Sequence, residues 1–233
     1  MAGTETTTRK GERTRALILE TALDLFRERG YDATTMRLIA ERADVALGNT
    51  YYYFRSKEHL VQAFYERVDD AQRVETAAAL VHETDLKTRL RIVVRAVIEI
   101  MQPYHRFAGS LFRSAADPRS PLSPFGPEST EARRKGIPLL AEVVDGSKTW
   151  VPDDLRAELP RLLWLYQMGV VLFWIHDRSP EYVRTERLID HTTEIVARLI
   201  SLASLPVLRP LRRRTLRLLA DLQVNELSLS NPV

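Results

Sequence analysis

Cysteine is absent from this 233-residue sequence, so disulfide bonds and thiolate metal sites are excluded. The longest apolar run, residues 162–175, is interrupted by Gln167 and is too short to span a bilayer. The first residues, MAGTETTT, lack the apolar core of a signal peptide. We therefore expect a cytoplasmic protein with no membrane partner.

Strand patterns and catalytic motifs are missing as well. No segment alternates polar and apolar residues with a period of two, and no repeat of solenoid length occurs. Residues 146–149 (GSKT) imitate only the end of a phosphate-binding loop, without its upstream glycine spacing. The five histidines include no i, i+4 pair suited to a metal ion. We expect no enzymatic activity, no cofactor and no metal.

Charge is nearly balanced overall but unevenly placed. The net charge is +3, yet Arg9, Lys10, Arg13 and Arg15 crowd the N-terminal end, and five arginines occupy residues 209–217 without an acid among them. Such runs are commonly solvated surface. The sequence does not decide whether the segment 209–217 binds DNA, packs on a dimer or does neither.

Apolar residues recur at helical spacing through most of the chain, which predicts an all-α fold. A first helix contains Ile18 and Phe26 and ends at Gly30, and a second begins at Thr34 or Thr35. A short third helix follows, and a long fourth helix begins at Ser56. Their expected bounds, and those of the later helices, are about 47–53, 56–80, 85–102, 104–115, 128–144, 153–177, 180–203 and 208–222, with a proline-rich loop at 117–127.

The segment 34–57 carries the strongest functional signal. Two short helices joined by a tight turn form a helix-turn-helix, whose second helix enters the major groove of DNA. The second helix here reads LGNTYYY, residues 47–53. Its glycine allows close approach of the backbone, and its asparagine and threonine can hydrogen-bond base edges. Tyr52 is left open between packing and exposure.

The stretch TTMRLIAERADVALGNTYYYFRSKEHL resembles the DNA-binding signature of the TetR family of repressors, and the resemblance covers about the first 60 residues. Asp44 stands where the turn usually has glycine, and Ala46 where a serine cap is common. Asp tolerates left-handed backbone better than most residues, so we expect the turn to survive. Loss of the cap costs about 1 kcal/mol of helix stability.

The resemblance implies a three-helix DNA-binding domain at residues 1–57 and a larger helical domain for effector binding and dimerisation at 58–233. Phe54 is expected to pack in the core of the first domain. The implied contacts to double-stranded operator DNA come from Thr35, Arg37, Gly48, Asn49, Thr50, Tyr51, Tyr53 and Lys57, of which the first two and the last two contact phosphates.

The same resemblance implies a homodimer in which the helices near 153–177 and 180–203 pair with those of a second copy. It also implies a repressor that leaves its operator when a small hydrophobic or amphipathic effector binds. A constitutive or activating regulator without an effector remains the alternative, and the effector residues can also be ordinary core. Those residues are Met101, Tyr104, His105, Phe107, Phe112, Trp164, Gln167, Met168 and Trp174.

Overall fold

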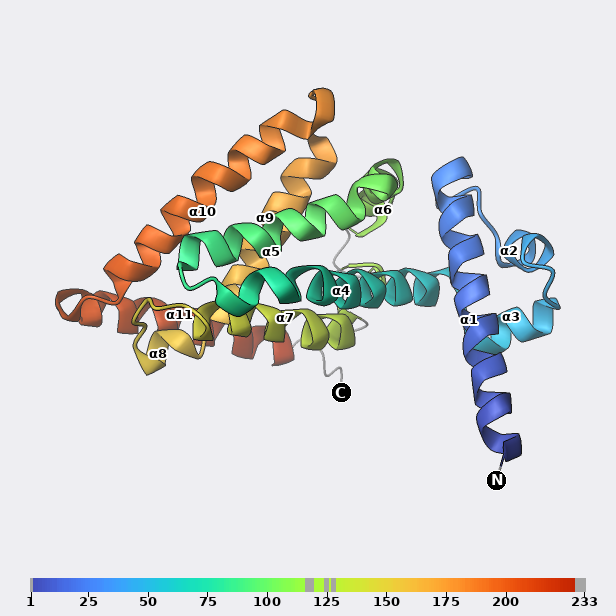
Figure 1. The fold of residues 1–233 in the computed structure, drawn as a ribbon, viewed down its shortest axis with the longest axis horizontal. Helices are drawn as coiled ribbons and strands as arrows, with labels where there is room; N and C mark the ends of the chain where they lie inside the picture. Colours follow the sequence, from blue (N-terminus) through green and yellow to red (C-terminus); the bar gives the residue numbers. More distant parts are fainter. Residues whose placement is uncertain (1, 116–119, 124–125, 127–128, 229–233) are drawn as a thin grey trace. The chain divides into compact units, whose positions relative to one another are not determined.

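A computed structural model of the chain describes residues 2–115, 120–123, 126 and 129–228. All the secondary structure in these residues is helical, with no strand among them, which confirms the predicted all-α fold (Figure 1). Contacts divide the chain into two compact units. Unit 1 contains residues 1–72 and 99–136, and unit 2 contains 73–98 and 137–233. The predicted domain boundary after residue 57 stays a prediction. Part of the predicted loop at 117–127 lies outside the described residues.

Unit 1 is built on a core of stacked aromatic rings. The rings of Phe26 and Phe107 lie parallel with centroids 4.9 Å apart, and Phe64 meets Phe107 edge-on at 5.7 Å. Aromatic pairs in these geometries add to the stabilisation from burial. The helices that supply this unit are α1 (Ala2–Arg29), α2 (Met36–Arg42), α3 (Leu47–Tyr53), the first part of α4 (Lys57–His82), η1 (Gln102–Tyr104) and α6 (His105–Ala115).

Unit 2 contains two breaks that the sequence analysis did not predict. Its helices include α5 (Leu86–Met101), α7 (Thr130–Asp145), α8 (Asp153–Arg156), α9 (Leu159–His176), η3 (Pro180–Tyr182), α10 (Val183–Ala203), η4 (Pro206–Leu208) and α11 (Arg209–Ser228), of which α5 and α7 also reach into unit 1. The single helix predicted over 153–177 is wrong: Pro160 has no N–H to donate to Arg156, so α8 ends and α9 begins anew.

The turn between α9 and α10 causes the second break. Glu181 and Tyr182 adopt left-handed backbone, with φ of 51° and 55°, so α10 begins at Val183 and not at residue 180. Buried Asp177 holds this turn through four hydrogen bonds. Its carboxylate accepts from the backbone N–H and the hydroxyl of Ser179 at 2.8 and 2.7 Å, and from those of Thr185 at 2.9 and 2.7 Å.

Arg89 joins three segments of unit 2 from the inside. Its side chain is buried, and its guanidinium donates to backbone carbonyls at the end of α4, just beyond it, and at the end of α7. The acceptors are Leu80 at 2.7 Å, Glu83 at 2.6 Å, Glu142 at 2.7 Å and Val143 at 2.9 Å. Leu80 and Val143 lie in the last turns of α4 and α7, where helix carbonyls lack intrahelical partners, so Arg89 satisfies them.

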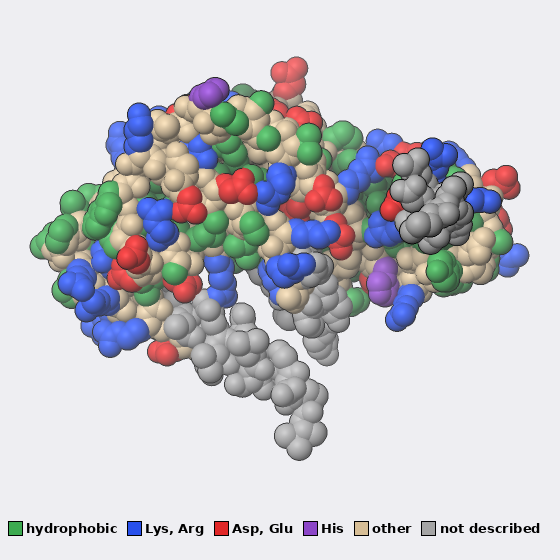
Figure 2. Space-filling view, turned by 60° about the horizontal axis from the view of Figure 1, so that its bottom comes forward, with side chains coloured by type: hydrophobic (Ala, Val, Ile, Leu, Met, Phe, Trp, Pro, Cys, Tyr) green, Lys and Arg blue, Asp and Glu red, His purple; other side chains and the backbone are tan. Residues whose placement is uncertain are grey.

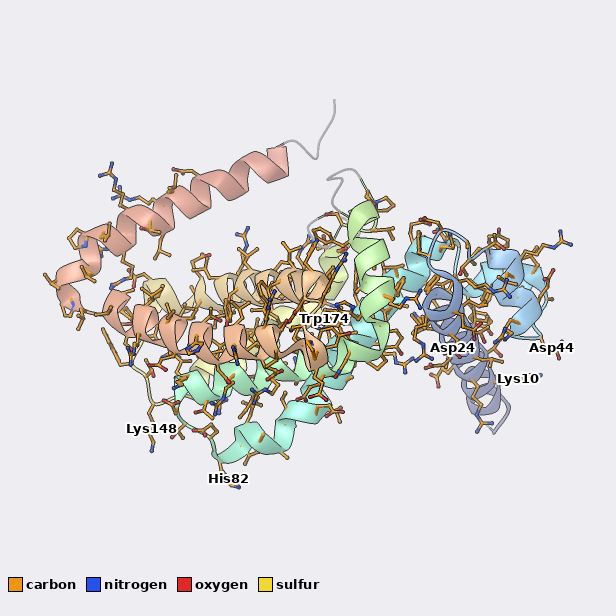
Figure 3. The ribbon with its side chains drawn as sticks, turned by 90° about the horizontal axis from the view of Figure 1, so that it is seen from above. Lys10, Asp24, Asp44, His82, Lys148 and Trp174 are labelled. Atoms are coloured by element: carbon orange, nitrogen blue, oxygen red, sulfur yellow. The ribbon has the colours of Figure 1, made fainter. Side chains whose placement is uncertain are left out.

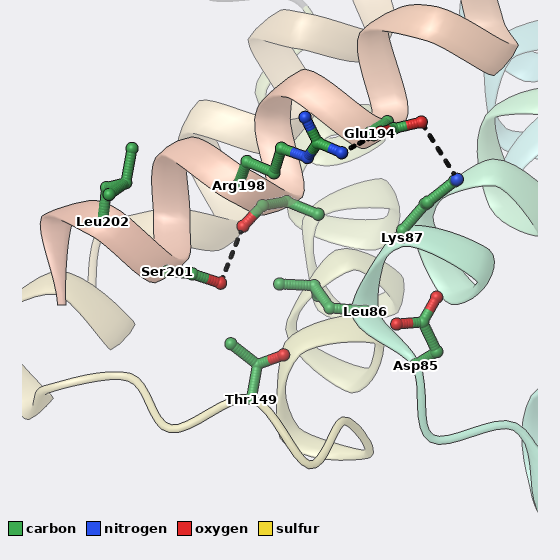
Figure 4. Close-up of a pocket in the computed structure, with 9 residues that line it drawn as sticks. Asp85, Leu86, Lys87, Thr149, Glu194, Arg198, Ser201 and Leu202 are labelled. Carbon is green, nitrogen blue, oxygen red and sulfur yellow. Dashed lines mark hydrogen bonds and ion pairs between the residues drawn. The ribbon is translucent and has the colours of Figure 1, made fainter.

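A ladder of opposite charges joins α5 to α10. Lys87 Nζ lies 3.1 Å from Glu194 Oε2, and Arg95 Nη2 lies 2.7 Å from Glu186 Oε2. Between them, Arg91 approaches Asp190 at 4.0 Å. The spacing of four residues on both helices shows that α5 and α10 run antiparallel along this seam. Near Lys87 the seam opens into a shallow groove lined by Thr149 and several residues of α5 and α10 (Figure 4).

Candidate nucleic-acid interface

The helix-turn-helix forms from α2 and α3, with a left-handed residue at the turn. The hydroxyl oxygen of Thr35 caps α2 by accepting from Leu38 N at 3.1 Å. Asp44 has a φ of 52°, which confirms the expected turn geometry (Figure 3). The side chain of Ala46 makes no capping bond to α3, again as expected. The turn therefore survives both departures from the usual pattern.

Helix α3 is anchored by its inner face. Thr50 is fully buried, and its hydroxyl donates to Ala46 O at 3.3 Å. Phe54, directly after the helix, is buried as predicted, and the guanidinium of Arg15 lies 4.9 Å from the centre of its ring. The structure thus places the Thr50 side chain on the inner face of α3, not on the face predicted for it.

The outer face of α3 is open to solvent. Gly48 and Asn49 are exposed, and a Cβ added at Gly48 would meet no atom within 4 Å. Tyr51 is 47% exposed and Tyr52 is 80% exposed. Tyr52 crosses the half-buried Tyr53 edge-on, with centroids 5.1 Å apart. Sequence reasoning left Tyr52 undecided, and its exposure places it on the candidate interface.

Basic and hydroxyl side chains flank this face. Thr35 is exposed, although its hydroxyl is used as the cap described above. Arg37 leaves 81% of its side chain exposed and pairs with Glu41 at 3.2 Å. Exposed pairs of this kind contribute little free energy, so the guanidinium can exchange Glu41 for a phosphate. Arg55, which sequence reasoning missed, is exposed directly after the reading helix.

Lys57 acts in this structure as a brace. Its Nζ donates to Tyr31 O at 2.8 Å and lies 4.2 Å from the centre of the Tyr31 ring, while the Tyr31 hydroxyl donates to Glu58 at 2.9 Å. Burial lowers the pKa of Lys57, and burial with the bond to Glu58 raises the pKa of Tyr31. The brace fixes the α1–α2 loop to the start of α4. The phosphate contact of Lys57 stays a prediction.

The residues predicted to bind an effector divide between the two units. In unit 1, Met101 and Phe107 are buried, and the Tyr104 ring meets Phe64 at 4.9 Å. The remaining members of this group, His105 and Phe112, are half-buried. In unit 2, helix α9 carries buried Trp164, Gln167 and Trp174 and half-buried Met168, and Figure 3 labels Trp174 within that helix bundle. Their common pocket stays a prediction.

Two findings on the described residues bear on other functions. No group of three or more His, Asp or Glu side chains there is arranged to hold a metal ion. None of the helices in the same part of the chain is both long and apolar enough to cross a membrane.

Two family descriptions match the sequence. "Bacterial regulatory proteins, tetR family" matches residues 18–64, and "Tetracyclin repressor-like, C-terminal domain" matches residues 89–215. The chain belongs to the TetR family. The first match contains the whole helix-turn-helix of this TetR-family chain, and the second covers more than half of its sequence and ends within α11.

Known TetR-family proteins share parts of the sequence and the fold. The chain is 31% identical over 104 residues to the probable HTH-type transcriptional regulator YttP of Bacillus subtilis, covering 43% of this chain and 49% of that protein. It is 48% identical over 59 residues to the HTH-type transcriptional repressor KstR of Rhodococcus jostii, covering 24% of this chain and 28% of that protein. The matches thus span half or less of these relatives. A TetR regulator from Nitrosomonas europaea has the same fold, with a TM-score of 0.60 at 18% identity, over 78% of this chain and 97% of that structure.

Proposed function

We propose that this protein is a DNA-binding transcriptional regulator that reads operator DNA with α3. The observation that carries the proposal is the division of α3 into two faces. Thr50 is buried, whereas Gly48, Asn49 and Tyr51 are exposed together on a helix short enough to lie in a major groove. Tyr52 adds a second large ring that is 80% exposed on this surface.

The side chains divide between base recognition and backbone contact. Asn49 can form a bidentate pair with adenine, and Gly48 lets the backbone approach the bases. We assign Arg37, Tyr51 and Tyr53 to phosphate contacts, which position a protein on the duplex without reading its sequence. Lys57 supports this surface by holding the start of α4 against Tyr31.

Dimerisation is the second part of the proposal. Helix α9 exposes Leu165, Leu172 and Phe173, which lie on one face, and a Cβ added at Gly169 between them would meet no atom within 4 Å. Helix α10 exposes a second apolar row at helical spacing, Ile195, Leu199 and Leu202. Two helices with apolar outer faces are suited to pair with a second copy as a four-helix bundle. The dimer would present two reading helices to two half-sites.

The third part is repression relieved by an effector. The repressors among the relatives, such as KstR, support the direction of control. The aromatic side chains within unit 1 and those within unit 2 each offer apolar surface of the kind that a hydrophobic or amphipathic molecule needs. An effector that favours one of two states by about 1–3 kcal/mol would weaken operator binding roughly 5- to 150-fold.

The proposal is tested by fluorescence anisotropy with a labelled duplex from the promoter of the protein's own gene. We expect affinity to fall steeply with salt, since bound phosphates release counterions. Arg37→Ala should weaken binding to cognate and random duplexes alike. Asn49→Ala should cost about 1–3 kcal/mol on the cognate duplex alone. An affinity that does not change with salt concentration would contradict the proposed reading surface. So would an equal loss of affinity for both duplexes in both variants.

Effector release is tested separately, with dodecanoate as an amphipathic probe. We expect it to raise the melting temperature and to lower the affinity of the dimer for the same duplex, because a ligand that binds the folded state stabilises it. Stabilisation without any loss of DNA affinity would contradict release by this class of molecule, while leaving the DNA-binding proposal in place.

A further inference from the structure

The Lys57 ammonium is held in place without using all of its hydrogen-bonding capacity. Its Nζ donates one hydrogen bond within the described part of the chain, to Tyr31 O at 2.8 Å, and lies 4.2 Å from the centre of the Tyr31 ring. An ammonium has three N–H donors, so two remain for an acceptor outside the chain. The side chain is only half-buried, which leaves room for such an acceptor.

Tyr31 is itself fixed firmly enough to serve as a support. It is buried, its ring meets that of Phe26 with centroids 5.4 Å apart, and its hydroxyl donates to Glu58 Oε1 at 2.9 Å. Its carbonyl oxygen also accepts from Thr34 N at 3.3 Å. The ring and the carbonyl that hold Lys57 are therefore both anchored, one through Glu58 and the other through the turn that leads into α2.

This arrangement lies at the edge of the proposed reading surface. Lys57 is the first residue of α4 and comes four positions after Tyr53, the last residue of α3. Tyr31 comes four positions before Thr35, the N-cap of α2. The ammonium therefore joins the loop that enters the helix-turn-helix to the chain that leaves it.

The surface around these helices carries charges of both signs. Basic and acidic side chains are mixed over the part of the molecule that holds α1, α2 and α3, at the right of Figure 2. Asp32 is exposed there, and its charge and that of Glu58 favour the charged form of Lys57 against the effect of burial, which lowers the pKa. A mixed surface has no broad positive potential to attract a phosphate, so a contact depends on where a single cation is held.

We infer that Tyr31, anchored by Glu58, is a positioning residue that holds the Lys57 ammonium ready for a phosphate of operator DNA. This inference rests on the proposed DNA-binding function and on the phosphate contact predicted for Lys57. A free lysine side chain loses rotational freedom when a ligand fixes it, and that loss weakens binding. Here the loss has already occurred on folding, so the remaining donors meet the phosphate pre-organised. Lys57 keeps its contacts with Tyr31 in the complex.

A double-mutant cycle on the full-length protein tests the inference, by anisotropy with the same promoter duplex. Lys57→Met should weaken binding to cognate and random duplexes about tenfold or more, and reduce the slope of log K against log salt by about one. Tyr31→Leu removes the ring and should weaken binding about tenfold. Tyr31→Phe keeps the ring and should recover most of that loss. In the Lys57→Met background, Tyr31→Leu should cause no further loss.

Arg37→Ala supplies the matched background, because Arg37 is also assigned to a phosphate but pairs with Glu41. In that background Tyr31→Leu should keep its full effect, since the effects of independent sites add. An equal effect of Tyr31→Leu in the Lys57→Met and Arg37→Ala backgrounds would show that Tyr31 acts only on the stability of unit 1, and would overturn the positioning role.

Two further outcomes separate this inference from the proposed function. If Lys57→Met binds the duplex as tightly as the parent protein, the phosphate contact fails and the positioning role fails with it. The reading surface on α3 would then still stand on its own test. If the parent protein binds no duplex, the proposed function fails, and the inference fails as its consequence.

A spectroscopic measurement needs no substitution at Tyr31, so it does not depend on how well Tyr31→Leu folds. Protein labelled with ε-¹³C lysine gives few signals, because the chain has five lysines, and Lys57→Met identifies the one from Lys57. The ring current of Tyr31 should shift the ε-methylene protons of Lys57 upfield. We expect this shift to persist when the duplex is added. Its loss on DNA binding would show that Lys57 leaves the ring, contrary to the inference.

Discussion

Arg89 shows how a single buried cation can organise a helical unit. Its guanidinium donates only to backbone carbonyls in the bonds described above, at the ends of α4 and α7. Those carbonyls carry the negative ends of the helix dipoles, which explains why a positive charge is tolerated there. Gly146 is part of the same arrangement, because a Cβ at that position would lie 2.2 Å from Arg89 Nη2.

We therefore expect Gly146→Ala to destabilise the protein by about 1–3 kcal/mol, since the added methyl group displaces the guanidinium. Arg89→Met should cost about 3 kcal/mol or more, because several buried carbonyls lose their donor. Urea unfolding followed by circular dichroism measures both changes.

Gly48→Ala is the matched control for Gly146→Ala. Its Cβ meets no atom within 4 Å, and alanine in a helix should stabilise α3 by up to about 1 kcal/mol. An equal change in the free energy of unfolding for Gly146→Ala and Gly48→Ala would contradict the proposed clash with Arg89.

Asp177 makes stability depend on pH. Burial raises the pKa of its carboxyl, but the hydrogen bonds from Ser179 and Thr185 outweigh burial and lower the pKa from 3.8 to about 2. A carboxyl with a depressed pKa stabilises the fold above its ordinary pKa and loses that contribution as the pH falls through the lowered value. The relevant window therefore runs from about pH 4 down to pH 2.

We expect Asp177→Asn to be less stable than the parent protein by about 2 kcal/mol near neutral pH, because an amide nitrogen then faces two donors. The gap should narrow as the pH drops through that window, since the parent loses its carboxylate there. Thermal melting of both proteins across this range tests the prediction. A gap of constant size would show that the charge of Asp177 does not hold the α9–α10 turn.

Among the elements, the ladder between α5 and α10 makes the clearest energetic prediction. Arg95→Glu would place a negative charge against both Glu186 and Asp190, while Arg95→Glu/Glu186→Arg restores one pair. We expect a coupling of about 0.5–1 kcal/mol from the double-mutant cycle, shrinking in high salt, because these side chains are partly exposed. Urea unfolding at two salt concentrations supplies the values. The more exposed Arg37–Glu41 pair should give a smaller coupling energy. A coupling energy for Arg37–Glu41 larger than that for Arg95–Glu186 would contradict a stabilising role for the ladder.

Element boundaries show what the sequence can and cannot predict. Gly30 was predicted to end the first helix, because glycine readily adopts left-handed backbone, and Thr35 was one of two residues predicted to begin the second, because its hydroxyl can cap a helix. Both predictions are confirmed. The division of residues 153–177 near Pro160 was missed, because the long apolar run that follows favoured a single helix over the break that the proline indicates. The left-handed pair at Glu181 and Tyr182 has no sequence signature of its own, since the hydrogen bonds that stabilise this turn are made by its flanking residues: Ser179 and Thr185 donate to Asp177.

At the scale of the whole molecule, the recognition surface was more predictable than the effector site. The short reading helix is fixed by contacts within a few residues, so its exposed glycine, asparagine and tyrosine follow from the local pattern. Thr50 was misplaced because a hydroxyl can bond either a base or the helix's own backbone at Ala46. The predicted effector residues lie in two units, and no local pattern in the sequence specifies the packing of residues so far apart along the chain.

Dimerisation and DNA binding should be coupled through geometry alone. Two linked reading helices bind two half-sites with an effective concentration that a single helix lacks, which increases affinity by about 10²–10⁴-fold. Leu172→Glu places a charge on the exposed apolar face of α9 and should dissociate the proposed dimer. We expect it to lose roughly a hundredfold in affinity for a duplex with both half-sites and almost nothing on a duplex with one. Anisotropy with the two duplexes, and sedimentation velocity for the oligomeric state, give the comparison.

Val74→Glu is the matched control, because Val74 is 77% exposed on α4 and lies outside the proposed dimer face. It adds the same charge without touching α9 or α10, so both affinities should remain unchanged. A similar loss on both duplexes for Leu172→Glu would mean that the substitution damages the reading surface itself. An unchanged dimer would instead place the interface elsewhere, because a buried unpaired carboxylate cannot be accommodated in an apolar contact without a cost of several kcal/mol.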